Sequence, residues 1–453
     1  MADQTVVDLY ALRPESIKVP PNTVSGALRR IGPGLITAAT VVGTGELIAT
    51  TVLGAENGYR LLWLVIVSCL IKVVVQNEMG RYTVGTGETA LAALNRVPGP
   101  RFRVSWVVWT WFLMEATALT ALSGMFAGIA EVLNRIVPAV AISAWVWIVM
   151  LVTLVVLAVG RYRLVENVSF ALVAVFTALT VSAAVLLGMR PEFFSWPRLL
   201  DGLLFDLPQG GLVTAVAVLG LTGVGSSDLV IYPYWCIEKG YARFTGPRDD
   251  TSAWLGRARG WIKVMGYDVA SSMLLYTAAT IAFYLLGAGV LHGLGIVPEG
   301  AETLRILSNI YTETLGAWSL HCFLAGAVAI LYSSIFGGAA ASARVFADFA
   351  ALAGAYDGGD YRRRRRAIQL LTGVVLVLPV IYYMALPELV LLVKIGGVAQ
   401  ALMLPILSFS VLYLRYRHLP KSIAPKGWIT LTLWVTSAVM AVMMGYSVLQ
   451  QLG

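Results

Sequence analysis

The chain carries two similar stretches that decide its fold: PGLITA at residues 33–38 followed by GTGELI at 43–48, and GGLVTA at 210–215 followed by GVGSSDLV at 223–230. In each stretch an apolar helical segment meets a Gly-X-Gly and then an acidic residue. Glycine costs about 1 kcal/mol relative to alanine inside a helix, so two close glycines weaken the helix locally. The pattern predicts two helices that are interrupted at these glycines.

Composition places both stretches in a membrane. The chain has 453 residues, of which 58% are hydrophobic and only 13% are charged, whereas soluble proteins carry about 25% charged residues. A helix of roughly 20 apolar residues crosses the hydrocarbon core, and the sequence contains eleven such stretches. They are centred near Thr40, Ile66, Leu119, Leu151, Val175, Leu221, Leu275, Ala329, Val375, Val398 and Val439. We therefore predict an all-α polytopic membrane protein.

The order of these spans relates the two interrupted helices to each other. The second comes five spans after the first, and because five is odd the two run in opposite directions through the membrane. An inverted repeat with a broken helix in each half is typical of secondary transporters, which bind their substrates at the breaks. The alternative is that the glycines only allow neighbouring helices to pack closely.

The net charge of +8 follows a topological pattern that gives no reason to expect nucleic-acid binding. Lysine and arginine gather in the N-terminal tail and in the connections after even-numbered spans, for example at 81–103, 239–263, 362–366 and 415–426. Cytoplasmic loops carry such an excess. We therefore expect a multi-pass protein of the cell membrane, surrounded by lipid, with its N-terminus in the cytoplasm and its C-terminus outside.

Two carboxylates follow the predicted breaks, Glu46 and Asp228. A charge near the bilayer centre costs several kcal/mol unless it is paired or hydrated. Together with freed backbone carbonyls, the two carboxylates would form an oxygen-rich site for a hard cation or an ammonium group, and they could share a proton. We therefore predict both as metal ligands. The alternative for Glu46 is a structural pairing with a lysine on a neighbouring helix.

Other polar residues join the prediction by their position. The expected substrate-binding residues around the breaks are Gly43, Thr44, Gly45, Glu46, Gly223, Gly225, Ser226, Ser227 and Asp228. Glu115 and Asp268 are also embedded in spans, and we predict that they relay protons or gate access. Lys72 and Lys394 could supply counter-charges. The segment Tyr232-Pro233-Tyr234-Trp235 is either an aromatic anchor at the membrane interface or an aromatic wall for a cationic substrate.

Several short motifs resemble the Nramp family of proton-coupled divalent-metal transporters. Gly32-Pro33-Gly34 opens the first span as in that family, and Leu404-Pro405 matches its helix 10. Gln76, Arg81, Val84, Thr86 and Gly87 match the end of its helix 2, and Ser333-Ser334 match its glutamine-serine-serine motif, with Tyr332 in place of the glutamine. The resemblance implies a LeuT-like fold of two inverted five-helix repeats plus an eleventh helix. The expected division is a cytoplasmic tail at 1–30, repeats at 31–188 and 189–413, and the last helix at 414–453.

The metal-binding motifs of the family do not match. Its helix 1 motif, Asp-Pro-Gly-Asn, is replaced by Gly43-Thr44-Gly45-Glu46, and its helix 6 motif, Met-Pro-His, falls on Ser227-Asp228-Leu229. The soft thioether that favours manganese and iron is therefore absent from helix 6. Gln400 lies one turn from the family's helix 10 glutamine and completes the predicted substrate-binding set. The chain is identified as a divergent member of the family.

These observations predict a secondary active transporter, not an enzyme. The expected substrate is a hard divalent ion, magnesium-like or manganese-like, moved by alternating access and coupled to protons in the way the resemblance implies. An organic cation or an amino acid on the same fold is the alternative. We expect a monomer without a cofactor.

Overall fold

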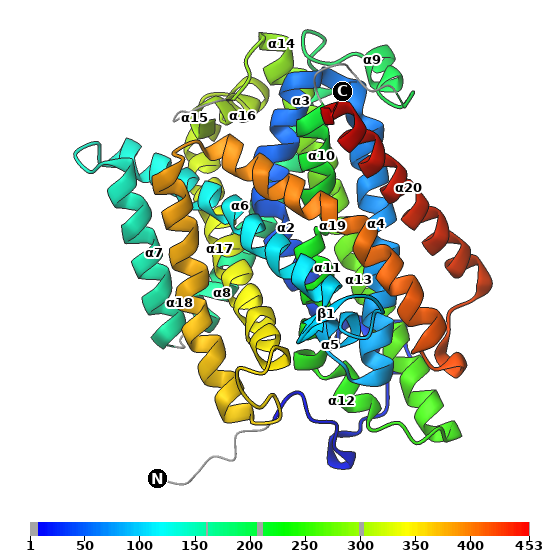
Figure 1. Ribbon diagram of the computed structural model, residues 1–453. Coiled ribbons are helices and arrows are strands. Elements are labelled where there is room, and N and C mark those ends of the chain that lie inside the picture. The colour runs from blue at the N-terminus through cyan, green and yellow to red at the C-terminus, as the bar shows by residue number, and fades with distance from the viewer. Residues whose placement is uncertain (1–7, 160–161, 206–211, 299–302, 453) are drawn as a thin grey trace.

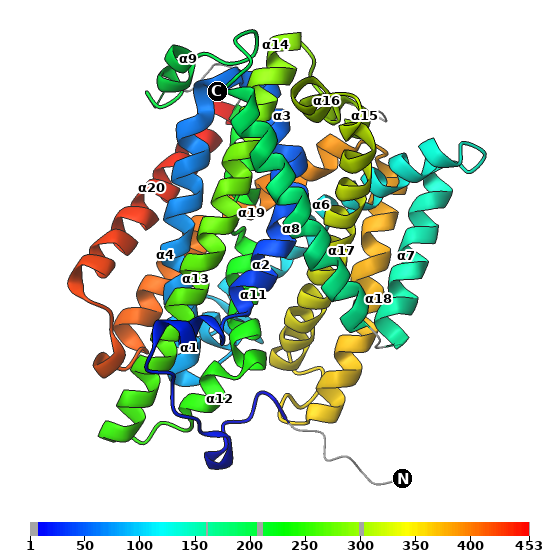
Figure 2. The same ribbon diagram turned by 180° about the vertical axis from the view of Figure 1, so that it is seen from behind.

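The computed structural model describes residues 8–159, 162–205, 212–298 and 303–452, which form a bundle of helices (Figures 1 and 2). The long helices are α4 (Leu62–Thr86), α6 (Trp106–Ile136), α7 (Ile142–Val159), α8 (Tyr162–Leu187), α13 (Ser252–Leu286), α17 (Ser319–Leu352), α18 (Tyr361–Ala385), α19 (Leu389–Arg417) and α20 (Gly427–Leu452). Shorter helices are α1 (Val24–Leu28), α2 (Pro33–Val41), α3 (Thr51–Asn57), α5 (Ala90–Leu94), α9 (Trp196–Asp201), α10 (Leu212–Leu221), α11 (Ser226–Lys239), α12 (Tyr241–Thr245), α14 (His292–Leu294), α15 (Thr303–Leu307) and α16 (Asn309–Leu315). Two π-helical stretches are η2 (Val42–Thr50) and η4 (Gly287–Leu291), and three 3-10 turns are η1 (Pro14–Ser16), η3 (Gly58–Leu61) and η6 (Lys421–Ile423). The strands β1 (Arg101–Phe102) and β2 (Val104–Ser105) pair antiparallel.

Each of the eleven predicted spans falls on a helix or on consecutive helices. The first is the series α2, η2 and α3, and the sixth is the pair α10 and α11. Within the described residues, seven helical stretches are long and apolar enough to cross a membrane, and three shorter apolar helices accompany them. The predicted all-α polytopic class is therefore confirmed.

The outer surface of the bundle is apolar. Exposed leucines and valines cover α7, α18 and α20, which lie at the periphery in Figure 1, among them Leu151, Val155, Leu370, Leu431 and Val442. Many polar side chains are instead buried between the helices. This inside-out distribution suits a protein whose solvent is lipid.

The described part of the chain begins and ends at opposite ends of the molecule (Figure 1), as an odd number of crossings requires. The N-terminal end also holds α1, α5, β1 and α12 (Figures 1 and 2), so the predicted basic connections around 81–103 and 239–263 share one end. The assignment of that end to the cytoplasm stays a prediction. So do the repeat boundaries, although α8 ends at Leu187 and α19 at Arg417, close to the expected limits.

The first span differs from its prediction. We expected an unwound break at Gly43, and that expectation is wrong in form, because the chain continues from α2 to α3 through the wide turns of η2. In a π-helix each N–H reaches one residue further back, and such turns often occur at functional sites. Threonine hydroxyls support the wide turns, since Thr50 Oγ1 donates to the carbonyl of Gly45 at 2.8 Å and Thr51 Oγ1 to that of Glu46 at 3.4 Å.

The sixth span is interrupted as predicted. The helix stops after Leu221 and resumes at Ser226, and we call residues 222–225 the break. Gly223 has φ +58, a left-handed conformation that favours glycine. A side chain there would also come within 3.0 Å of the Tyr276 ring. The first two residues of the GGLVTA motif, 210 and 211, lie outside the described part of the chain.

Glycines also let the central helices approach closely, which was the alternative interpretation. A β-carbon on Gly43 would lie 2.0 Å from Ser334 Oγ of α17, and one on Gly45 would lie 2.6 Å from the Leu221 carbonyl oxygen of α10. One on Gly220 would lie 1.9 Å from the Gly397 carbonyl oxygen of α19. The glycines of the first span therefore serve packing, whereas Gly223 of the break serves backbone shape.

Candidate substrate site

A cavity of about 100 Å³ that contains two carboxylates lies beside the break. Its walls come from the first span and from α6, α10, α11, α17 and α19. It is lined by Thr40, Val41, Gly45, Glu115, Ala118, Leu119, Ala121, Leu122, Met125, Leu221, Ser227, Asp228, Ile231, Ser334, Gly338, Ser342 and Gln400. Four of the predicted substrate-binding residues, Gly45, Ser227, Asp228 and Gln400, are brought together here.

The start of α11 presents Asp228 to this cavity. Asp228 Oδ2 accepts a hydrogen bond from the Gly225 N–H at 3.0 Å, so the carboxylate caps the first turn of its own helix. Gln400 approaches from α19, where its Oε1 accepts from the Ser227 N–H at 3.3 Å and its main-chain carbonyl accepts from Ser226 Oγ at 2.6 Å. The two side chains therefore bring carboxylate and amide oxygens to one wall of the cavity.

Glu115 supplies a second carboxylate. It stands on α6, is almost completely buried, and accepts hydrogen bonds from Ser227 Oγ at 2.6 Å and Ser342 Oγ at 2.7 Å. These contacts join α6, α11 and α17 around one carboxyl group. The sequence placed Glu115 in a proton path or gate, and that role stays a prediction. The structure adds that Glu115 shares the cavity with Asp228.

Glu46 reaches the same break from the other side of its backbone. Its Oε1 accepts from the Gly223 N–H at 3.0 Å, and its Oε2 accepts from Thr50 Oγ1 at 3.2 Å. Glu46 is fully buried and is not among the residues that line the cavity. Glu46 and Asp228 thus converge on one Gly-Val-Gly turn, but only Asp228 faces the cavity. The assignment of both as metal ligands stays a prediction.

Lys72 of α4 completes the surroundings of the break. It is fully buried, and its Nζ donates to the carbonyl of Leu219 at 2.8 Å and to that of Thr222. The Thr222 hydroxyl has its own partner in Ser68 Oγ at 2.7 Å. Lys72 also interacts electrostatically with Glu46 and Asp228. The other candidate counter-charge, Lys394, pairs instead with Glu56 at 2.7 Å.

Asp268 lies apart from the cavity. Its two carboxylate oxygens accept from the N–H groups of Gly32 at 2.7 Å and Gly34 at 2.6 Å, at the start of α2. Free N–H groups at a helix N-terminus attract a carboxylate in this way. Tyr232 of α11 donates to the same side chain at 3.0 Å. The predicted role of Asp268 in proton relay or gating remains untested, and its contacts are those of a helix cap.

The aromatic segment after Asp228 does not line the cavity. Tyr232 donates to Asp268, Tyr234 donates to Asp348 at 2.7 Å, and the Arg344 guanidinium lies 4.9 Å from the Trp235 ring centre. The residues that line the cavity include none of these three aromatic side chains. The structure therefore offers no support for an aromatic wall around the substrate.

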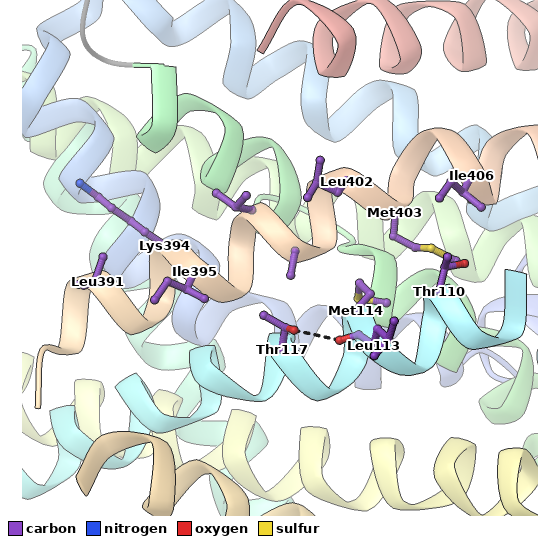
Figure 3. A pocket seen from close by; sticks show the side chains of 12 residues that line it. Thr110, Leu113, Met114, Thr117, Leu391, Lys394, Ile395, Leu402, Met403 and Ile406 are labelled. Carbon is purple, nitrogen blue, oxygen red and sulfur yellow. Dashed lines mark hydrogen bonds between the residues drawn. The ribbon is translucent and has the colours of Figure 1, made fainter. Parts of the chain in front are cut away.

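A second, larger hollow of about 530 Å³ lies between α6 and α19 (Figure 3). Its lining is mostly aliphatic, as the labelled Leu113, Leu402 and Ile406 show, and both leucines are exposed on the outside of the bundle. Lys394 stands at one end of it, held by Glu56. A groove of this kind suits lipid chains, so the candidate substrate site is the smaller cavity that holds the two carboxylates.

Some cavity residues escaped sequence reasoning. Thr40 and Ser342 carry hydroxyls. Met125 brings a thioether from the third span, whereas the family motif would place one in the sixth span. Single serines or threonines in an apolar span give no signal of their own, because most of them bond to their own helix. Thr44 was predicted, but its side chain lies outside the described part of the chain.

The donor set of the cavity is mixed. No group of three or more histidine, cysteine, aspartate or glutamate side chains among the described residues could hold a metal ion. An ion in this cavity would therefore be shared by the Asp228 and Glu115 carboxylates, the Gln400 amide oxygen and serine hydroxyls. Oxygen ligands of this kind suit a hard cation.

Comparison with known sequences gives one family. The model of the natural resistance-associated macrophage protein-like (Nramp) family matches residues 34–450. An uncharacterized protein of Pasteurella multocida is 25% identical over 323 residues, which make up 68% of each chain. A Pseudomonas aeruginosa protein named divalent metal cation transporter MntH 1 is 26% identical over 276 residues, 58% of this chain and 57% of the relative. The divalent metal cation transporter MntH of Mycobacterium tuberculosis is 25% identical over 70% of this chain and 69% of the relative.

Solved structures agree on the fold. The manganese transporter of Eremococcus coleocola, in complex with an aromatic bis-isothiourea substituted compound, superimposes with a TM-score of 0.64 at 16% identity, over 96% of this chain and 89% of that one. MhsT in complex with L-phenylalanine gives a TM-score of 0.56 at 16% identity, over 95% of this chain and 99% of that one. These likenesses confirm the LeuT-like arrangement of two inverted five-helix repeats plus an eleventh helix.

Proposed function

The chain belongs to the Nramp family, and on this premise we propose that it is a secondary active transporter that moves a divalent metal ion through the cavity beside the break. The family assignment makes it a membrane transport protein and not an enzyme. The choice of ion, the ligands and the coupling to protons are the parts that we propose.

The cavity itself carries the proposal. Sites for drug-sized organic ligands are about 300–1,000 Å³, whereas this one is about 100 Å³ and presents two carboxylates, one amide oxygen and several hydroxyls. That volume suits an ion with a few waters better than an amino acid with a large side chain. Asp228 and Glu115 would be the charged ligands, with Gln400 and Ser227 as neutral oxygen donors.

Charge balance supports a divalent ion. Three buried or cavity-lining carboxylates, Glu46, Glu115 and Asp228, surround the break, together with one ammonium group, that of Lys72. If all are ionised, three negative charges against one positive charge leave two negative charges, which a divalent cation would neutralise. Uncompensated charge at this depth is costly. Protons could neutralise the same carboxylates when the metal is absent, and this exchange would link metal transport to protons.

The test is metal binding by the purified full chain. We expect calorimetry to detect Mn²⁺ or Mg²⁺ binding that Asp228→Asn and Glu115→Gln each weaken by about tenfold or more, which corresponds to about 1.4 kcal/mol. Glu192→Gln is the matched control, because Glu192 is exposed and pairs with Arg190 at 3.8 Å, away from the cavity, and binding should be unchanged. In proteoliposomes, uptake of the same metal should acidify the lumen.

Two results would contradict the proposal. Unchanged metal binding in Asp228→Asn and Glu115→Gln would remove these ligands from the site. Thermal stabilisation of the wild-type chain by amines or amino acids, with none by divalent metals, would favour the organic solute instead. Metal uptake without any change in lumenal pH would leave metal transport standing and exclude proton coupling.

A further inference from the structure

We propose that Lys72 is a tethered cation, whose ammonium group fills a latent site for a small monovalent cation at the carbonyl end of the break. The inference concerns the back of the break and holds whichever ion the cavity takes. Lys72 is not among the residues that line the cavity, so it is separate from the proposed substrate ligands.

The end of α10 creates the need for a cation. The last carbonyls of a helix have no partner within the helix, and they carry the negative end of its dipole. Inside a membrane protein no bulk water is available to satisfy them, and each unsatisfied group costs several kcal/mol. Here the carbonyls of Leu219 and Thr222 converge on one point, and the Lys72 ammonium group donates to both.

The geometry around Lys72 is that of an ion site and not of a surface ion pair. Lys72 is fully buried, and its bonded acceptors are both main-chain carbonyls of the broken helix. The nearest carboxylate on the same break, Glu46, binds the Gly223 N–H instead. Lys72 and Glu46 therefore bind opposite sides of one peptide group, the Thr222 carbonyl and the Gly223 N–H, and the two side chains interact electrostatically.

This arrangement has two consequences for cation use. In the wild-type chain the latent site is already filled, so no sodium or potassium ion is needed to hold the break open. Without the lysine side chain, the two carbonyls and the nearby Glu46 carboxylate would leave a vacant, negatively polarised pocket. A small cation such as ammonium should then bind in it, whereas a large one such as choline should be excluded by size.

Chemical rescue tests the proposal. Lys72→Ala should lower the Tm of the purified full chain, and ammonium chloride should raise it again by about 2–4 °C or more relative to choline chloride at equal ionic strength. The wild-type chain should show no such difference between the two salts. Lys394→Ala is the matched control, because Lys394 is a partly exposed lysine paired with Glu56, and its loss should not be rescued selectively by ammonium.

Lys72→Met separates packing from charge. Methionine fills much of the same volume without a positive charge, so this variant should be less stable than the wild type and should respond to neither salt. If Lys72→Met is as stable as the wild type, or if choline rescues Lys72→Ala as well as ammonium does, Lys72 is only a packing residue. If Lys72→Ala fails to fold, metal uptake by the wild-type chain tests the proposal instead. We expect uptake to continue when sodium is replaced by choline. Uptake that stops would show that the break needs a free cation and would contradict the proposal.

Discussion

At the scale of single residues, the chemistry of the site depends on how each carboxylate is already engaged. Asp228 Oδ2 accepts a hydrogen bond from the Gly225 N–H, and both oxygens of Glu115 accept hydrogen bonds from serine hydroxyls. A carboxylate oxygen has further lone pairs, so both groups can still bind a cation while their neighbours hold them in place. Glu46 differs, because its contacts bind it to the backbone of the break and to Thr50.

Gly43 gives a prediction at this scale. Gly43→Ala would place a methyl group 2.0 Å from Ser334 Oγ, and overpacking of this kind costs about 1–3 kcal/mol. We expect a lower Tm in thermal unfolding, partly restored by adding Ser334→Gly, which removes the group that collides. Gly373→Ala on α18 is the control, since nothing lies within 4 Å of that position, and it should be neutral or stabilising. Equal effects of the two alanines would contradict the packing role.

At the level of residues, the sequence drew attention to positions where charge was conspicuous. Asp228 and Glu115 stand out because acidic residues in apolar spans need a reason, and both line the cavity. The sequence could not divide the roles of Glu46 and Asp228, because both follow a Gly-X-Gly. That division depends on which face of the broken helix each side chain approaches, and only the packing of α4, α10 and the first span decides it.

At the scale of elements, the same glycine pattern has produced two different structures. In the sixth span a left-handed glycine opens the helix, whereas in the first span the turns only widen. Threonines account for part of the difference. The hydroxyls of Thr50 and Thr51, which follow the first Gly-X-Gly, donate to the Gly45 and Glu46 carbonyls of the wide turns. The second Gly-X-Gly is followed by Ser226 and Ser227, which bond to α19 and α6 instead. Sequence alone located both irregularities and could not tell a widened helix from an open one.

Thr50 gives a prediction for the wide turns. Thr50→Val keeps the shape of the side chain and removes the hydroxyl that serves Gly45 and Glu46, so a buried carbonyl loses its partner at a cost of about 1–3 kcal/mol. We expect a lower Tm together with reduced metal uptake. Thr110→Val on the outer face of α6 is the control, because that hydroxyl bonds only its own helix. A Thr50→Val variant with wild-type stability would show that the wide turns do not need the hydroxyl.

At the scale of the whole molecule, hydropathy and order along the chain predicted the architecture well. The eleven spans, their pairing into inverted repeats and the separation of the termini all depend on long-range regularities that local errors do not disturb. The cavity was harder to predict, since its walls come from five spans that are distant in the sequence. Orientation in the membrane is still inferred from the basic connections alone.

Cysteine labelling tests that orientation. In a background without Cys322, the exposed native cysteine, Asp249→Cys places a thiol near α12, at the N-terminal end of the molecule, and Glu192→Cys places one near α9, at the other end. We expect a membrane-impermeant maleimide to label the Glu192→Cys variant in intact cells and the Asp249→Cys variant only after permeabilisation. The reverse pattern would invert the topology and place the N-terminus outside.

The cap that Asp268 provides for α2 has a mechanical consequence. One carboxylate on α13 holds two N–H groups at the foot of the first span and also accepts the hydroxyl of Tyr232 on α11. The Asp268 carboxylate thereby links α2, α11 and α13 at one point near the N-terminal end of the molecule. If α2 tilts during transport, α11 and α13 move with it as one rigid body, or the three hydrogen bonds to Asp268 break. The segments that can bend to allow such a tilt are the wide turns of the first span and the open turn at Gly223.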